Sequence, residues 1–192
     1  MSSPHYYTTV GGTVYDLRWV VSFRETPAQV LATFFGAPCS PLSFDPASFL
    51  VAWDASRAGN PAFLGSPAIS VALPDLILGQ TTLNVLFVTR YVDYPVLGYV
   101  DAWFASAAMA EDAQVPVNPP IRIPRASFLS VVPSGSQWYN PGGGNTYYNM
   151  DWVSLWNRST PAMVRFADSS DIVIGFALTG FENAMQASKT RS

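Results

Sequence analysis

The sequence predicts an all-β protein with the architecture of a two-sheet antiparallel β-sandwich, a jelly roll of about eight strands. Apolar and polar residues alternate in many short segments of the 192-residue chain, which is typical of half-buried strands. Turn-forming residues separate these segments, and neither an internal repeat nor a regular alternation of helices with strands is evident. Because 49% of the residues are hydrophobic and 14% aromatic, the chain has ample material for a core.

The first expected strand covers residues 13–24, where apolar and polar side chains alternate. Thr26 and Pro27 then provide an N-cap and a first-turn proline, and the apolar residues that follow have helical spacing. We therefore expect one short helix near residues 27–35. The apolar face of the first strand is expected to contain Tyr15, Leu17, Trp19, Val21 and Phe23.

Further apolar segments between turn signals predict the remaining strands. The strand at residues 83–92 is apolar on both faces, so we expect it to be central, and Tyr94 and Pro95 separate it from a possible hairpin partner. The expected strands lie at residues 48–53, 68–73, 83–92, 97–105, 126–132, 150–156, 162–168 and 171–180.

Two long segments have no regular pattern and are candidates for contact with other molecules. Residues 106–125 are rich in proline and predict an extended segment that crosses the surface, and residues 134–149 combine three glycines with aromatic residues in a loop. Aromatic and apolar side chains of this kind dominate interfaces. The predicted interface residues are Val115, Val117, Ile121, Ile123, Trp138, Tyr139, Tyr147 and Tyr148.

The length favours a single domain over residues 1–192, with a flexible N-terminal segment at residues 1–12 and a C-terminal tail at residues 182–192. Only 12% of the residues are charged, and the net charge is −3. Since no cluster of Lys and Arg is present, we expect no strong direct binding to nucleic acid. No segment is long and apolar enough to span a membrane, and the first residues lack the pattern of a signal peptide.

Candidate catalytic residues are few, because the chain contains one histidine, His5, and one cysteine, Cys39. Neither a nucleophile-elbow motif nor a phosphate loop is present, and the three glycines at residues 142–144 indicate a turn. Asp168 and Asp171 flank two serines in a turn-rich segment, where turn capping explains them and calcium ligation is the alternative. We therefore predict that the protein is not an enzyme, and we assign it no catalytic residue, cofactor or metal site.

Near the C-terminus, a strand with arginine and an aromatic residue at 164–166 is followed by an acidic turn at 168–171 and an apolar strand from 172 to 180. This order resembles the last strands of the jelly-roll capsid proteins of picorna-like viruses. The low charge, the frequent proline and the long irregular connections are similar to such subunits as well. The resemblance implies a capsid protein that assembles with copies of itself or with other capsid subunits, in the virion and, during assembly, in the host cytoplasm.

We therefore expect a structural protein that self-assembles, a viral capsid or capsid-associated subunit, whose long segments bury apolar surface on neighbouring subunits. The alternative is a carbohydrate-binding, lectin-like β-sandwich module with a glycan receptor as its partner. That alternative depends on the four aromatic residues of the 134–149 loop, because sugar rings stack on tryptophan and tyrosine.

Overall fold

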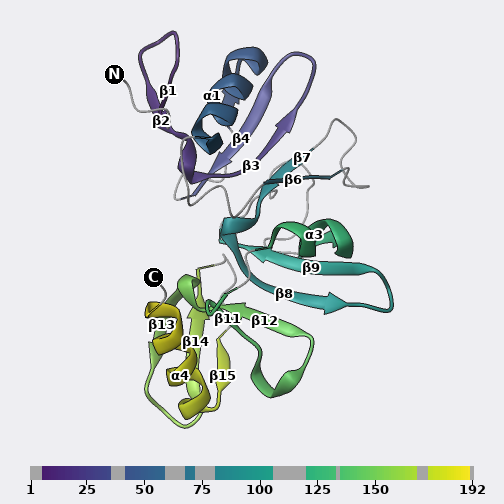
Figure 1. Cartoon of the computed structure of the whole chain (residues 1–192). Coiled ribbons are helices and arrows are strands. Elements are labelled where there is room, and N and C mark those ends of the chain that lie inside the picture. Colours follow the sequence, from purple (N-terminus) through teal and green to yellow (C-terminus); the bar gives the residue numbers. More distant parts are fainter. Residues whose placement is uncertain are drawn as a thin grey trace. The chain divides into compact units, whose positions relative to one another are not determined.

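The computed structural model describes residues 6–35, 42–58, 68–71, 81–105, 120–132, 135–167 and 173–190 (Figure 1). Within these residues the chain is mostly β, with four antiparallel sheets and three α-helices. The described residues form two compact units, the first up to Leu86 and the second from Phe87 onward. The single-domain organisation over residues 1–192 stays a prediction.

The first unit contains a hairpin, a five-stranded sheet and one helix. Its elements are β1 (Tyr6–Thr8), β2 (Val14–Asp16), β3 (Val20–Glu25), β4 (Val30–Phe34), β5 (Leu42–Phe44), α1 (Pro46–Ala58), β6 (Ala68–Val71) and β7 (Thr81–Asn84). Strands β1 and β2 pair with each other, and the larger sheet has the order β5-β4-β3-β7-β6. Because β7 returns to lie beside β3 after β4 and β5, these four strands have the Greek-key order.

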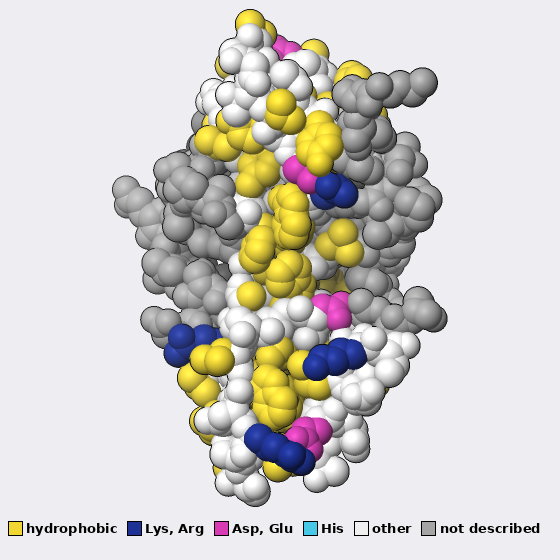
Figure 2. Space-filling view, turned by 90° about the vertical axis from the view of Figure 1, so that its left-hand side faces the viewer, with side chains coloured by type: hydrophobic (Ala, Val, Ile, Leu, Met, Phe, Trp, Pro, Cys, Tyr) yellow, Lys and Arg dark blue, Asp and Glu magenta, His cyan; other side chains and the backbone are white. Residues whose placement is uncertain are grey.

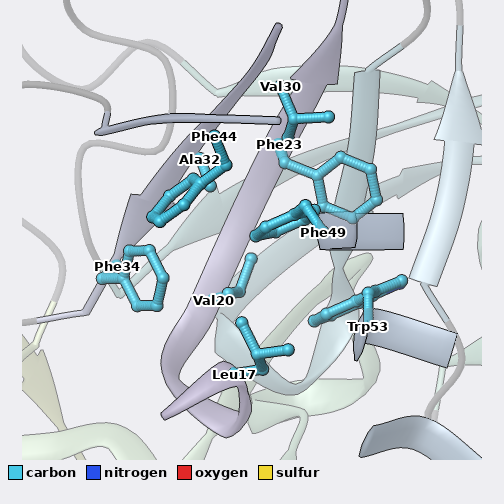
Figure 3. Packing of buried hydrophobic residues seen from close by; sticks show 9 residues of the cluster. All are labelled: Leu17, Val20, Phe23, Val30, Ala32, Phe34, Phe44, Phe49 and Trp53. Atoms are coloured by element: carbon cyan, nitrogen blue, oxygen red, sulfur yellow. The ribbon is translucent and has the colours of Figure 1, made fainter. Parts of the chain in front are cut away.

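The core of the first unit lies between α1 and the five-stranded sheet (Figure 3). Phe49 of α1 is fully buried, and its ring lies 5.3 Å from that of Phe23 and 5.2 Å from that of Phe44, measured between centroids. Trp53, one helical turn further on, contacts Phe23 at 5.3 Å. Edge-to-face and tilted contacts of this kind stabilise aromatic cores beyond the effect of burial alone.

The second unit contains a five-stranded sheet, a three-stranded sheet and two helices. Its elements are β8 (Val88–Tyr94), β9 (Tyr99–Phe104), β10 (Ile121–Pro124), α3 (Arg125–Val131), β11 (Trp138–Tyr139), β12 (Thr146–Asn149), β13 (Val153–Asn157), β14 (Ala162–Phe166), β15 (Ile174–Phe176) and α4 (Leu178–Lys189). The sheets have the orders β10-β9-β8-β12-β11 and β13-β14-β15. The single strand predicted for residues 83–92 is wrong, because a 3-10 turn at Val85–Phe87 divides it into β7 and β8, which belong to different sheets. The predicted hairpin with residues 97–105 is confirmed for β8, which pairs with β9.

The same order of elements occurs three times along the chain. Each repeat begins with a two-stranded hairpin, continues through a short 3-10 turn into three antiparallel strands, and ends with a helix. The turns are η1 (Leu17–Trp19), η2 (Val85–Phe87) and η4 (Met150–Trp152). We call the repeats module 1 (β1 to α1), module 2 (β6 to α3) and module 3 (β11 to α4).

The modules agree in detail as well as in order. In each module the strand after the 3-10 turn shifts register by one residue against its partner, between Val20 and Ser22, Val88 and Arg90, and Val153 and Leu155. The next residue is aromatic in all three modules, and its ring contacts a fully buried phenylalanine of the module's helix. These pairs are Phe23 with Phe49, Tyr91 with Phe128, and Trp156 with Phe181. The expectation of no internal repeat is therefore wrong.

The helix predicted near residues 27–35 is wrong, because Val30–Phe34 forms strand β4. The spacing of its apolar residues fits either structure. In the strand, which lies between β3 and β5, alternate residues Val30, Ala32 and Phe34 are buried in the core that contains Phe49 and Trp53 of α1. Hydrogen bonds to β3 and β5 satisfy the backbone donors and acceptors of this segment. A short helix would have to satisfy them by itself.

Two predicted strands, residues 48–53 and 126–132, lie instead in helices α1 and α3. The start of α1 explains the first error, since the Asp45 carboxylate accepts a hydrogen bond from the Ser48 backbone N–H at 3.0 Å and Pro46 is the first helical residue. Aspartate followed by proline is a helix-start signal.

Smaller corrections concern the ends and the first strand. Residues 6–8 belong to β1 rather than to a flexible segment, and residues 182–189 belong to α4, where Ser188 is buried. The strand expected at 171–180 ends at Phe176. Trp19 is 47% exposed, because the 3-10 turn interrupts the alternation predicted for residues 13–24. Fifteen strands are present in the described part of the chain, several of them only two or three residues long.

Candidate functional site

Consecutive modules are joined by the addition of strands to a sheet. In the first unit, β7 of module 2 pairs with β3 of module 1, so that Leu83 lies opposite Ser22. In the second unit, β12 of module 3 pairs in the same way with β8 of module 2, and Tyr148 lies opposite Arg90. Each joining strand brings its hairpin partner with it, so each of these sheets gains two strands from the next module.

A buried asparagine holds each of these two joins. The Asn84 side-chain amide donates a hydrogen bond to the Val20 carbonyl of the preceding module at 2.9 Å, and its oxygen accepts one from the Leu86 N–H at 3.1 Å. Asn149 makes the equivalent bonds, to the Val88 carbonyl at 3.0 Å and from the Asp151 N–H at 3.1 Å. Both roles need a side chain that donates and accepts, as a primary amide does.

Module 1 carries Asp16 at the position of these asparagines. Its carboxylate caps η1 in the same way, by accepting a hydrogen bond from the Arg18 N–H at 3.1 Å. The second oxygen, where asparagine carries its amide nitrogen, forms an ion pair with Arg18 at 2.6 Å, and this hydrogen bond raises the pKa of the guanidinium. An ionised carboxylate cannot donate to a carbonyl. Asp16 thus preserves the cap and lacks the donor that forms the join.

The first and last modules each present half of such a join. In the described part of the chain, β13 pairs only with β14, whereas its counterparts β3 and β8 pair on both sides. Leu155 of β13 is consequently 66% exposed, while Ser22 at the same position in β3 is 3% exposed. At the other end β2 pairs, among the described strands, only with β1, and Val14 is 57% exposed, whereas its counterpart Thr82 in β7 is 9% exposed.

The residues predicted as an interface within 106–125 do not gather in one exposed segment. Val115 and Val117 lie outside the described residues. Ile121 and Ile123 form part of β10, where Ile121 is half-buried and Ile123 is fully buried. Ile123 therefore belongs to the core. Of the segment predicted as extended over residues 106–125, residues 121–124 form β10 and Arg125 begins α3, while residues 106–119 lie outside the described residues.

The four aromatic residues predicted on a loop lie in strands β11 and β12. The ring of Tyr147 stacks on that of Tyr91 at 4.7 Å, and Trp138 meets the same Tyr91 ring edge-to-face at 5.1 Å. Tyr139 and Tyr148 pack against the core of module 3, where each contacts Phe176. Burial raises the pKa of Tyr91 and that of Tyr148. These rings are parts of an intramolecular join.

Two ion pairs tie β10 and α3 to the β8–β9 hairpin. Arg125 donates two hydrogen bonds to the Asp93 carboxylate at 2.7 and 3.0 Å, and Arg122 makes the same bidentate contact with Asp101 at 2.9 and 3.0 Å. The Arg122 guanidinium also lies 3.8 Å from the centroid of the Tyr99 ring. Planar bidentate pairing fixes orientation as well as charge, so these arginines have structural roles.

In the part of the chain that the structure describes, no group of three or more His, Cys, Asp or Glu side chains could hold a metal ion. Likewise, no described helix has both the length and the apolar composition to cross a membrane. His5, Cys39, Asp168 and Asp171 lie outside the described residues. Comparison of the chain with protein-family models, with curated proteins and with solved structures finds no match.

The joining residues are not among the predicted site residues, although the sequence around them carries a signal. The segments Thr13–Asp16, Thr81–Asn84 and Thr146–Asn149 all begin with threonine and end with an amide or acid three residues later. Each segment is followed by an apolar residue, and a tryptophan or phenylalanine lies two residues after that apolar residue. The similarity covers few positions, so only the shared backbone makes it evident.

Proposed function

We propose that this protein is a structural subunit that associates with copies of itself through the open sheet edges of its terminal modules. One observation carries the proposal: the join is made twice within the chain, and each terminal module holds one half of it that no described strand completes. An unpaired strand presents a row of backbone donors and acceptors that pair readily with another strand.

The surface near these edges supports association. Leu155 and Val14 are large apolar side chains that are exposed, and each lies in a strand with one edge that no described strand covers. Charged residues make up only 12% of the chain, and Figure 2 shows apolar side chains at the surface of one face, with charged groups beside them at several places. Proteins protect free edges with charges, especially lysine, and with proline. The described residues of β13 include neither.

Sedimentation velocity of the full chain across a wide range of concentrations tests the proposal. We expect the weight-average sedimentation coefficient to rise with concentration, because association through edges is reversible. A coefficient that stays at the monomer value up to high concentration would overturn the proposed function.

The narrower proposal, a jelly-roll capsid subunit of a picorna-like virus, is supported by the resemblance of residues 164–180 and by the Greek-key order of the strands. Electron microscopy of the associated protein tests it. Closed shells of uniform size, which rings of subunits can build, support a capsid subunit, and open filaments contradict it.

The carbohydrate-binding alternative stays a prediction that no observation favours. The aromatic rings on which it depends contact Tyr91 and Phe176 within the molecule. A glycan array, with the full chain as probe, tests it directly.

A further inference from the structure

We infer that association is head-to-tail: the β1–β2 hairpin of one copy adds to the free edge of β13 in another copy. This inference rests on the proposed function and specifies which surface meets which. The partner is a second copy of this chain because the chain itself contains, in β7–β6 and β12–β11, two hairpins of the same module position that make this addition to β3 and β8.

The internal joins fix the register of the intermolecular one. Ser22 pairs with Leu83 and Phe23 with Thr82 in the first unit, and Arg90 pairs with Tyr148 and Tyr91 with Tyr147 in the second. If the strands of two copies pair in the same register, Leu155 of one copy lies opposite Tyr15 of the other. The same register places Trp156 opposite Val14. The three-stranded sheet β13-β14-β15 would then gain two strands and match the five-stranded sheets of the other modules.

The geometry of the two ends determines the form of the assembly. The β2 edge and the β13 edge are different surfaces, and each copy has one of each, so the contact is heterologous. A heterologous contact produces a ring if the rotation between copies closes, and an open filament if it does not. A symmetric dimer would instead need two copies of the same edge to pair.

Asp16 makes the intermolecular join weaker than the internal ones. In the same register its carboxylate faces the Val153 carbonyl, where Asn84 and Asn149 donate hydrogen bonds to Val20 and Val88. Two acceptors then meet without a proton between them, and the lost hydrogen bond leaves a buried acceptor unsatisfied. Copies therefore associate reversibly while modules within one chain stay joined.

Two single variants, each blocking one end, test the head-to-tail arrangement. Val14→Asp places a carboxylate in β2 where the internal counterpart Thr82 is buried. Leu155→Lys places an ammonium in β13 directly opposite Arg165 of β14, without the Trp103 ring that lies beside Arg90 in module 2. Both wild-type side chains are exposed in the single chain, so we expect both variants to fold. Circular dichroism checks this.

Each variant alone should associate at least about tenfold more weakly than the wild-type protein, since burial of a charge without a partner is unfavourable. An equimolar mixture should form a 1:1 dimer and nothing larger, because the intact β13 of Val14→Asp meets the intact β2 of Leu155→Lys. Val51→Asp and Val96→Lys, which change exposed side chains on α1 and on the β8–β9 turn, are the matched controls and should associate as the wild type does.

Asp16→Asn provides the opposite test, a gain of association. The new amide can donate to the Val153 carbonyl of the next copy, so we expect the dissociation constant to fall about tenfold. Asp54→Asn, at an exposed position of α1, removes the same charge outside the two strands that meet and should have no effect.

The outcomes separate the inference from the proposed function. A wild-type protein that stays monomeric overturns both. If the wild type associates, then normal association of either end variant, failure of the mixture to dimerise, or an unchanged dissociation constant for Asp16→Asn overturns the head-to-tail arrangement alone.

Discussion

Strands β8 and β13 occupy the same position in modules 2 and 3, and they differ in one respect: β12 covers the outer edge of β8, whereas no described strand covers that of β13. The register shift and the aromatic contact with the helix are the same in both. Exposure is different, since Val88 and Thr89 are fully buried while Val153 is half-buried and Ser154 is exposed. The fold of a module is thus set by its own residues, and its burial is set by its neighbour.

The comparison implies that the three helix phenylalanines are energetically equivalent. We expect Phe49→Ala, Phe128→Ala and Phe181→Ala each to lower the free energy of unfolding by about 3–5 kcal/mol, the usual cost of deleting a buried aromatic side chain. Urea denaturation measures this loss. A loss for Phe181→Ala far below that for Phe128→Ala would show that module 3, with its uncovered edge, has a looser core than module 2.

Unlike the three helix phenylalanines, the joining residues Asp16, Asn84 and Asn149 should contribute unequally to the free energy of unfolding. Asn84→Ala and Asn149→Ala remove a buried side chain that makes two hydrogen bonds, so we expect each to destabilise the protein by about 2–3 kcal/mol. Asp16→Ala removes the cap of η1 and a partly exposed ion pair with Arg18, and should cost about 1 kcal/mol. Thermal unfolding of the three variants, measured at a dilution where copies are separate, gives the comparison. Equal losses would contradict the distinct role assigned to Asp16.

These residues also show how much of the structure can be predicted from the sequence. The β-rich class and strands such as β9 and β14 could be predicted, because alternation over five or six residues has one simple structural explanation. Segments 30–34 and 48–53 could not, since short apolar runs fit a helix or a strand and pairing with distant residues decides between them. The candidate site was missed for a related reason. Asn84 is an ordinary turn residue in the sequence, and only its distance to Val20 reveals its role.

Tyr91 and its counterpart Trp156 contact the helix phenylalanine in the same way, but only Tyr91 carries an ionisable group. Burial raises the pKa of the Tyr91 hydroxyl in the folded protein above the usual value of about 10. The neutral Tyr91 hydroxyl therefore makes its full contribution to stability below about pH 10. This contribution is lost as the pH rises toward the pKa of Tyr91 in the folded protein. We expect Tyr91→Phe to lose less stability than the wild type between neutral pH and pH 11, measured by urea denaturation. An equal loss would contradict this assignment.

The smallest effect is expected at Leu155, the residue whose exposure distinguishes β13 most clearly from β3. Leu155→Thr keeps a side chain that suits a strand and removes apolar surface that is already in water, so the free energy of unfolding of separate copies should change by less than about 0.5 kcal/mol. The Ser22 position in β3 shows that a small hydroxyl side chain fits the joined sheet. Association of copies should accordingly persist, weakened only by the loss of apolar burial. Urea denaturation together with sedimentation velocity measures both quantities on one sample. A large loss of stability in separate copies would mean that Leu155 is covered within the single chain, and the edge of β13 would then not be free to accept a second copy.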